Sequence, residues 1–111
     1  MELSLASRTE GPWSVVEVRG EVDLATAPQL RESVLDLIDD GSHQIVVDLR
    51  GVDFMDSSGL GVLMTALKRL REYNGDLALV CREGPVLKVL SITGLDRVFP
   101  IYHDVAEATA S

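Results

Sequence analysis

One short run of residues, Ile45-Val46-Val47-Asp48-Leu49, constrains the fold more than any other part of the sequence. All but Asp48 are apolar and most are β-branched, a composition that favours a strand covered on both faces. Further along the chain, leucine and methionine recur at helical spacing between residues 60 and 70, and Asn74-Gly75 follows as a stop signal. The sequence therefore predicts a central buried strand that leads into an amphipathic helix.

Four other segments have the pattern of strands. Leu3 and Leu5 alternate with polar neighbours, and valines alternate with charged residues between Trp13 and Val22. These two segments are expected to pair as antiparallel strands. Short apolar runs from Leu77 to Cys81 and from Val98 to Tyr102 predict two more strands later in the chain.

Helical patterns separate these strands. Thr26-Ala27-Pro28-Gln29 resembles a capping box, in which Thr26 is the N-cap and Gln29 reaches back to it. The helix that follows is expected to end at Gly41. A third helix is predicted from Val86 to Ile92, and a last, weakly packed one from Asp104 to Ala108.

This alternation predicts an α/β fold with a mixed sheet of about four to five strands and four helices. The later strands are expected to run parallel, because helices connect them. With 111 residues, the chain has the length of a single domain. Its apolar runs are too short for a membrane span, and its first residues lack the basic and apolar parts of a secretory signal. We therefore expect a cytoplasmic protein that makes no membrane contact.

Charge and composition restrict the partners. Eighteen acidic residues against ten basic ones give a formal charge of −8, which would repel the phosphates of DNA or RNA, so no direct nucleic-acid binding is expected. The only cysteine, Cys81, lies in an apolar run and is interpreted as a buried hydrophobic residue. His43 and His103 are expected at surface or capping positions. No metal or cofactor is therefore predicted, and the free chain is expected to be a monomer.

The segment Asp56-Ser57-Ser58-Gly59-Leu60-Gly61 places two serines where the central strand turns into its helix. Aspartate and serine are common N-cap residues, so this segment has a purely structural interpretation. One cap suffices, however, and Gly59 and Gly61 each weaken the first helical turn by up to about 1 kcal/mol relative to alanine. These glycines would let the helix pack tightly on its sheet, or let a partner approach the serines. A hydroxyl at a helix start would also tolerate negative charge.

Several enzyme motifs fit this corner poorly. A dinucleotide-binding fingerprint would need a third glycine where Met64 stands. The phosphate-binding loop of nucleotide hydrolases needs a Gly-Lys-Ser/Thr end that the sequence lacks, so the chain is expected to accept a phosphoryl group and not to donate one. A serine hydrolase would need Gly-x-Ser-x-Gly, whereas Met55-Asp56 precedes Ser57 and no histidine is placed as its base. A hydrolase of unfamiliar type is our third hypothesis.

A phosphoaspartate receiver is the closer competitor. Asp48, Asp53 and Asp56 lie at or just after the predicted central strand, in a domain of similar size. The sequence lacks an acidic pair after the first strand and a lysine late in the chain, which a receiver would need. The residues alone therefore leave two leading classes open: a non-enzymatic binding module regulated by phosphorylation, and a receiver-like signalling domain.

The octapeptide Phe54-Met55-Asp56-Ser57-Ser58-Gly59-Leu60-Gly61 resembles the signature of bacterial anti-sigma factor antagonists, the single-domain members of the STAS family. Two other segments resemble the family as well: Gly20-Glu21-Val22-Asp23, and Ile92-Thr93-Gly94-Leu95 with the nearby Val98-Phe99. The resemblance spans nearly the whole chain. It implies that residues 1–111 form a single STAS domain.

This resemblance implies a regulatory function without catalysis. Proteins of this kind bind an anti-sigma factor that is also a serine kinase, and thereby free a sigma factor to direct transcription. Phosphorylation of the serine directly after the aspartate ends this binding, and a phosphoserine phosphatase would reverse it. In this sequence the phosphoacceptor would be Ser57, with Ser58 as the second candidate and Asp56 as the orienting carboxylate. The residues expected to contact the partner are Glu21, Asp23, Asp56, Ser58, Gly59, Leu60 and Gly61, although for Leu60 internal packing is the favoured interpretation.

Overall fold

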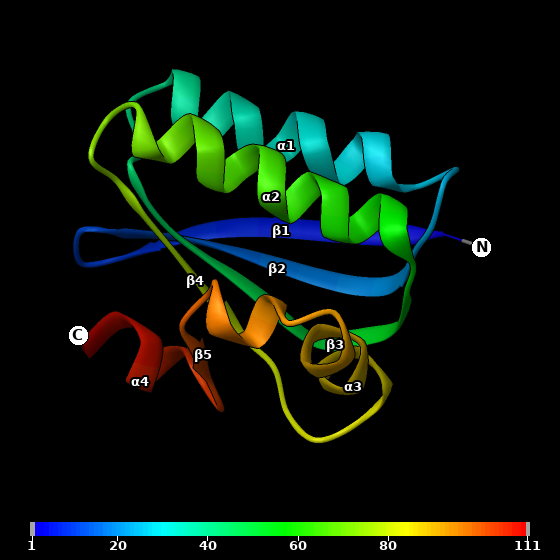
Figure 1. The fold of residues 1–111 in the computed structure, drawn as a ribbon. Helices are drawn as coiled ribbons and strands as arrows, with labels where there is room; N and C mark the ends of the chain where they lie inside the picture. Colours follow the sequence, from blue (N-terminus) through cyan, green and yellow to red (C-terminus); the bar gives the residue numbers. More distant parts are fainter. Residues whose placement is uncertain (1, 111) are drawn as a thin grey trace.

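The computed structural model describes residues 2–110, which form a five-stranded sheet whose strands follow the order of the chain (Figure 1). The strands are β1 (Leu3–Glu10), β2 (Trp13–Val22), β3 (Gln44–Met55), β4 (Asp76–Val80) and β5 (Ile101–Tyr102). The helices are α1 (Ala27–Asp39), α2 (Ser57–Arg71), α3 (Pro85–Ile92) and α4 (Val105–Ala110), with a short 3-10 helix η1 (Leu95–Arg97) after α3.

The strand directions confirm the predicted mixed sheet. β1 and β2 pair antiparallel, whereas β2, β3, β4 and β5 run parallel to one another. Because the sheet grows in one direction after β2, right-handed crossovers place the connecting helices on the same face. Figure 1 shows α1 and α2 side by side on that face, and α4 on the other side of the sheet.

Two hydrophobic clusters cover the sheet. The larger one joins the sheet to α1, α2 and α3, and its fully buried side chains include Leu30, Leu70 and Leu90. The smaller cluster lies on the opposite face, where Val46 of β3 packs in a group with Val105 of α4. β3 is therefore covered on both faces, as its apolar run predicts.

The one charged residue in the central run is buried in the sheet. Asp48 is 2% exposed, and Arg50 holds its carboxylate with Nε–H and Nη2–H donors at 2.9 and 2.7 Å. Burial acts to raise the pKa of Asp48, but the hydrogen bonds from Arg50 outweigh it and hold that pKa below its ordinary value. Asp48 is thus a paired carboxylate inside the sheet.

The start of α1 differs from the prediction. Thr26 is the N-cap, but its side chain makes no capping hydrogen bond; it donates to the carbonyl oxygen of Glu21 at 2.7 Å. Gln29 does not reach back to Thr26 either, because its side-chain amide donates to the carbonyl oxygen of Leu3. The capping-box prediction is therefore wrong, since both side chains bind neighbouring strands. The predicted end is confirmed: Gly41 has a φ of 102° just after the helix.

Two strands differ in length from their predictions. β3 extends past the apolar run to Met55, because β2 continues to pair with it as far as Val22↔Met55. Register shifts in β2 accompany this extension. The second half of β3 contains polar residues that break the regular alternation of a strand, so the sequence pattern does not indicate it. β5, predicted from Val98, contains only Ile101 and Tyr102. The N–H groups of Val98 and Phe99 donate to the carbonyl oxygen of Leu95 in the turn that follows η1, so these residues do not join the sheet.

Three residues for which no chemical role was predicted have ordinary structural roles: Cys81, His43 and His103. Cys81 is buried, and burial raises the pKa of its thiol, as expected of a small hydrophobic residue. His43 stacks on Tyr73 with ring centroids 4.1 Å apart, and exposed His103 accepts a hydrogen bond from Arg82 through its carbonyl oxygen. Within residues 2–110, no helix is long and apolar enough to cross a membrane.

Candidate functional site

The strand-to-helix corner is built around Asp56, which lies between the end of β3 and the start of α2. Its backbone is extended, and its carboxylate accepts the N–H of Ser58 at 2.8 Å. Its carbonyl oxygen accepts hydrogen bonds from the N–H groups of Gly59 and Leu60. Asp56 is therefore the N-cap of α2, and neither serine is needed for that purpose.

The two serines occupy the first turn of α2 in different surroundings. Ser57 is exposed, whereas Ser58 is half-buried and lines a hollow between α1 and α2. Neither hydroxyl makes a hydrogen bond to another residue in the described part of the chain. The hydroxyl of Ser57 is thus free and reachable from solvent, and the positive end of the helix dipole favours negative charge there.

The end of β2 lies directly beside this corner. Glu21 pairs with Phe54 in the sheet, Val22 pairs with Met55, and the N–H of Asp56 donates to the carbonyl oxygen of Val22 at 3.2 Å. The segments Gly20-Glu21-Val22-Asp23 and Phe54 to Gly61, which are far apart in the chain, therefore meet where β2 and β3 end.

The turn that follows β2 is held by Asp23. Its carboxylate accepts the N–H groups of Ala25 and Thr26 at 2.9 and 3.0 Å. The hydrogen bond from Thr26 is the main reason that the pKa of Asp23 lies below its ordinary value. Glu21 and Asp23 are half-buried. Together they place negative charge next to the serines, in a turn that the hydrogen bonds of Asp23 hold in place.

The two glycines of the corner have different roles. Gly59 is buried, and a Cβ atom there would lie 2.6 Å from Cγ of Met55 and 2.8 Å from Cγ1 of Val22. Gly59 therefore allows α2 to pack against the sheet, and its burial favours this packing role over the predicted partner contact. Gly61 is exposed, and a Cβ atom there would have no heavy atom within 4 Å. Packing does not explain Gly61.

These surroundings predict opposite effects for two identical substitutions. Gly59→Ala should lower the free energy of unfolding by about 1–3 kcal/mol, because Met55 and Val22 must move. Gly61→Ala should raise it by up to about 1 kcal/mol, because alanine favours the helix and meets no obstacle. Urea unfolding of both variants measures the difference. Equal effects of the two substitutions would contradict the packing role assigned to Gly59.

A hollow of about 300 Å³ opens beside the serines, between the N-terminal ends of α1 and α2. Leu24, in the turn after β2, forms part of its rim and is 80% exposed. Sequence analysis missed Leu24, although an apolar residue in a turn outside any helical or strand periodicity is the signal that marks it. The other residues around the hollow are Ala27, Pro28, Arg31, Ser58, Gly61, Val62 and Thr65.

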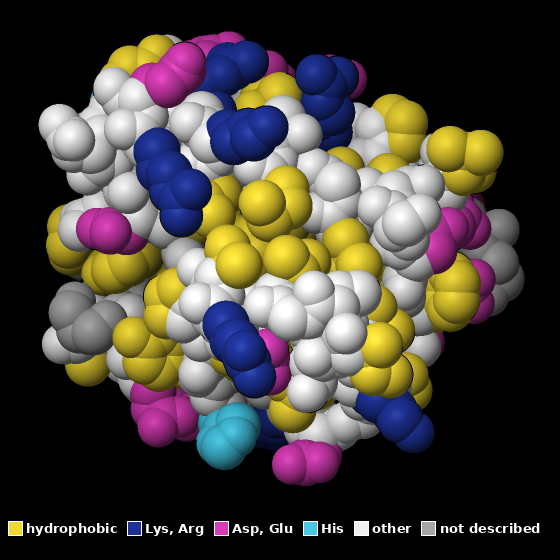
Figure 2. Space-filling model, in the orientation of Figure 1, with side chains coloured by type: hydrophobic (Ala, Val, Ile, Leu, Met, Phe, Trp, Pro, Cys, Tyr) yellow, Lys and Arg dark blue, Asp and Glu magenta, His cyan; other side chains and the backbone are white. Residues whose placement is uncertain are grey.

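Apolar side chains also reach the surface beyond the corner. Figure 2 shows a band of them across the middle of the face that carries α2, with lysine and arginine side chains next to it. Leu60 and Met64 of α2 and Leu95 of η1 are partly buried and pack against the main core. The packing interpretation of Leu60 is therefore confirmed, while part of its surface stays open to solvent.

The remaining chemistry of the site is limited. Within residues 2–110, no three histidine, cysteine, aspartate or glutamate side chains gather in a way that could hold a metal ion. Asp48, one of the carboxylates on which a receiver domain would depend, is buried and bound by Arg50. A group in that position cannot meet a phosphodonor without breaking the pair. This geometry weighs against the receiver hypothesis.

A five-stranded sheet whose first pair is antiparallel and whose other strands are parallel, covered by helices mainly on one face, is the architecture of a STAS-type α/β domain. The model of the STAS domain family matches residues 5–108 of the sequence, and the chain belongs to this family. A curated relative, the anti-sigma-B factor antagonist of Staphylococcus aureus, is 34% identical over 95 residues, which cover 86% of this chain and 88% of that protein.

Solved structures agree with this assignment. An anti-sigma factor antagonist from Mycobacterium paratuberculosis superimposes with a TM-score of 0.91 at 30% identity, covering 98% of this chain and 92% of that one. The Bacillus cell fate determinant SpoIIAA in its phosphorylated form gives a TM-score of 0.74, covering 96% of this chain and 97% of that one. At 24% identity, SpoIIAA shows the shared fold alone.

Proposed function

We propose that this protein is an anti-sigma factor antagonist that is switched off by phosphorylation of Ser57. In its unmodified form it binds an anti-sigma factor with serine kinase activity, and the sigma factor held by that partner is released. The kinase then transfers a phosphoryl group to the hydroxyl of Ser57, and a phosphoserine phosphatase restores the binding form. The chain acts in the cytoplasm and catalyses no step itself. The observation that carries this proposal is the exposed, unbonded hydroxyl of Ser57 at the start of α2.

The partner surface that we propose consists of residues around this hydroxyl. Glu21 and Asp23 contribute negative charge from the end of β2, and Gly61 offers a position where a partner backbone can approach closely. Exposed Leu24 adds an apolar contact beside the hollow. Asp56, Ser58 and the open part of Leu60 complete the surface.

A phosphate at this position disrupts docking through local charge. It adds about −1.5 to −2 charges at neutral pH, next to the carboxylate of Asp56. A partner that covers the corner would have to bury this charge, which is very costly without a matching cation. The start of α2 tolerates the same charge, because it lies at the positive end of the helix dipole. Modification thus blocks the interface and leaves the fold intact.

The names of the relatives support the proposed partner. Both the Staphylococcus protein and the Mycobacterium structure are described as anti-sigma factor antagonists, and each aligns with most of this chain. SpoIIAA, which has the same fold, exists in a phosphorylated form. These likenesses favour an anti-sigma factor over any other kind of partner.

Mapping of the phosphorylated residue tests this proposal. When the protein is mixed with candidate anti-sigma kinases and ATP, mass spectrometry should find one phosphate, on Ser57. Ser57→Ala should abolish phosphorylation and still bind the kinase, whereas the matched control Ser58→Ala should be modified normally. Normal phosphorylation of Ser57→Ala would move the acceptor to Ser58. A phosphate on an aspartate that mild base or hydroxylamine removes would instead support the receiver hypothesis.

A further inference from the structure

The helices α1 and α2 are linked to each other at one end and leave a hollow at the other. At their C-terminal ends, Arg69 of α2 donates to the carboxylate of Asp39 on α1 at 2.9 Å. At their N-terminal ends, no side-chain hydrogen bond or ion pair joins the two helices within residues 2–110, and the hollow of about 300 Å³ lies between them. The helix pair is therefore open next to the proposed phosphorylation site.

Small residues keep this hollow open. Ser58, Gly61 and Thr65 line it from α2, where they follow one another at helical spacing, and Ala27 lines it from the first turn of α1. A Cβ atom on Gly61 would meet no heavy atom within 4 Å, and almost any other residue favours a helix more than glycine does. Folding does not require the space above Gly61 to stay empty.

The hollow has the size and the lining that suit one apolar side chain. Its volume lies at the lower end of the range for small-molecule pockets. Of its eight lining residues, only Ser58, Thr65 and Arg31 have polar side chains. Leu24 on the rim is 80% exposed, so an apolar side chain that entered the hollow would also remove the surface of this leucine from water.

Arg31 gives the rim a positive charge that no described residue neutralises. It is exposed and forms no ion pair within residues 2–110. The α2 residues that share the hollow with it are uncharged. The positions three and four residues away on α1, where an acidic side chain could reach it, are all uncharged as well: Ala27, Pro28, Val34 and Leu35. In a chain of net charge −8, this arginine is available for a carboxylate of a partner.

The hollow adjoins the proposed phosphorylation site. Ser58, which lines it, directly follows Ser57 in the first turn of α2. Thr65 lies eight residues further along, about 12 Å from Ser57 at 1.5 Å per residue. A partner that brings a nucleotide to the hydroxyl of Ser57 therefore also comes within reach of the hollow, although Thr65 is too distant to touch the reacting groups.

We propose that the hollow between α1 and α2 receives an apolar side chain of the anti-sigma factor, and that a carboxylate close to that side chain in the partner pairs with Arg31. This inference rests on the proposed function and adds a recognition pocket to it. The pocket selects and holds the kinase, while Ser57 accepts the phosphoryl group. Filling the hollow should thus weaken docking and leave the chemical step unchanged.

The first test compares Thr65→Leu with Thr65→Ala. Both substitutions remove the hydroxyl, but only leucine fills the hollow. Thr65→Leu should bind the kinase at least about tenfold more weakly than Thr65→Ala, because the apolar side chain of the partner loses its place. Isothermal titration calorimetry measures this ratio. In phosphorylation assays KM should rise by a similar factor, while kcat at Ser57 stays within about twofold.

Gly61→Leu, compared with Gly61→Ala, provides a second filled variant. A side chain at this position meets no obstacle in the fold, so its effect on binding does not depend on the fit of leucine at Thr65. Urea unfolding of all four variants confirms that they are folded. Gly61→Leu should lose affinity for the kinase relative to Gly61→Ala, as Thr65→Leu does relative to Thr65→Ala.

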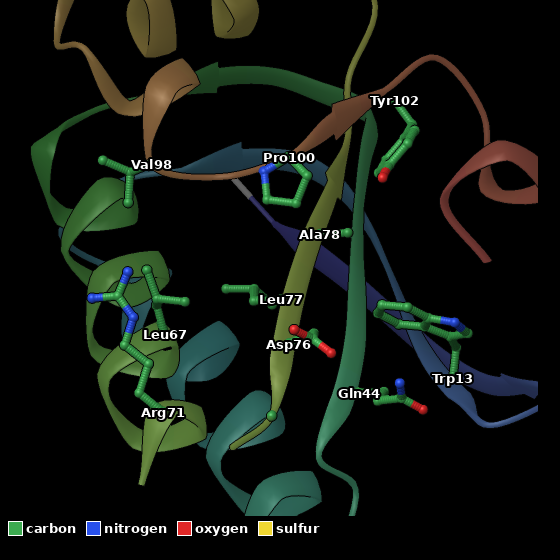
Figure 3. A pocket seen from close by; sticks show the side chains of 11 residues that line it. Trp13, Gln44, Leu67, Arg71, Asp76, Leu77, Ala78, Val98, Pro100 and Tyr102 are labelled. Carbon is green, nitrogen blue, oxygen red and sulfur yellow. The ribbon is translucent and has the colours of Figure 1, made fainter. Parts of the chain in front are cut away.

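The second test concerns charge. Arg31→Glu should weaken kinase binding by about tenfold at low ionic strength, because an attractive pair becomes a repulsive one, and this effect should shrink as salt is added. The effect of Thr65→Leu should persist in salt. Arg71→Glu is the matched control, since Arg71 is also exposed and has no ion pair in the described residues, yet it lines a separate hollow of about 450 Å³ beside Leu67 and Val98 (Figure 3). It should bind within about twofold of the unmodified protein.

The possible results separate this proposal from the proposed function. If Thr65→Leu and Thr65→Ala bound the kinase equally and both were phosphorylated normally on Ser57, the pocket would be refuted and the proposed function would stand. An equal loss in Arg71→Glu and Arg31→Glu would refute the specific pair with Arg31. Self-association of the free chain that Thr65→Leu abolishes, with unchanged kinase affinity, would assign the hollow to a second copy of the chain. If no anti-sigma kinase bound or modified the unmodified protein, both proposals would be wrong.

Discussion

Ser57→Asp should weaken binding to the anti-sigma partner by about a hundredfold, whereas Ser57→Asn should weaken it by less than tenfold. The two side chains have nearly the same size, so their comparison isolates charge from shape. A carboxylate at this exposed position would have to be buried beside Asp56 when the partner docks, which costs several kcal/mol. Isothermal titration calorimetry with the purified partner measures both affinities.

Ser57→Asp should leave the free energy of unfolding within about 0.5 kcal/mol of that of the unmodified protein, because the start of α2 accepts negative charge. Urea unfolding provides this control. If Ser57→Asn lost as much affinity as Ser57→Asp, shape and not charge would govern the contact. A large loss of stability in Ser57→Asp would point to a rearranged fold, in place of the local switch that we propose.

Arg50→Met should destabilise the protein by about 3 kcal/mol at pH 7, a far larger effect than expected for most charged residues at a surface. Asp48 is 2% exposed, and without Arg50 its carboxylate would stay buried and unpaired. The side chain of Arg50 is itself 33% exposed, so some water can reach the pair, and the cost lies near the lower end of the range for buried ion pairs. Urea unfolding measures the difference.

The pH dependence of this variant distinguishes an unpaired charge from lost packing. In the unmodified protein the pKa of Asp48 lies below its unfolded value of about 3.9, so the pair stabilises the fold above that pH and the stabilisation is lost in acid. In Arg50→Met, burial alone would raise this pKa, and the destabilisation would grow as the pH rises. The difference between the two proteins should therefore shrink from pH 7 to pH 3. The double variant Asp48→Asn with Arg50→Met should regain part of the loss at pH 7, whereas a difference that is constant with pH would contradict the argument.

Much of the fold could be predicted because its signals are local and strong. The apolar run from Ile45 to Leu49 indicated the central strand, and leucine periodicity indicated α2, since burial on two faces or on one stripe requires these patterns. Gly41 ended its helix as predicted, because few other residues adopt its positive φ. The serine-bearing corner was also evident, as three possible caps and two glycines are more than a helix start requires.

The features that escaped prediction depend on long-range contacts. The side chain of Thr26 binds Glu21 and that of Gln29 binds Leu3, in place of the local capping box. Gly59 could be recognised as a packing residue only when Met55 and Val22 were seen against it. The arginine that pairs with Asp48 lies only two residues further along, but the burial that makes the pair important appears only in the assembled sheet.

The corner around Ser57 and the turn after β2 are under different structural constraints. Packing constrains the octapeptide around Ser57, because Gly59 has no space for a side chain. Leu24 stands beside the same corner with 80% of its surface exposed, so the fold places little restriction on its identity. A change of partner preference therefore requires no change at the packed corner: under the proposed function, replacement of Leu24 alone should redirect the protein to another anti-sigma factor.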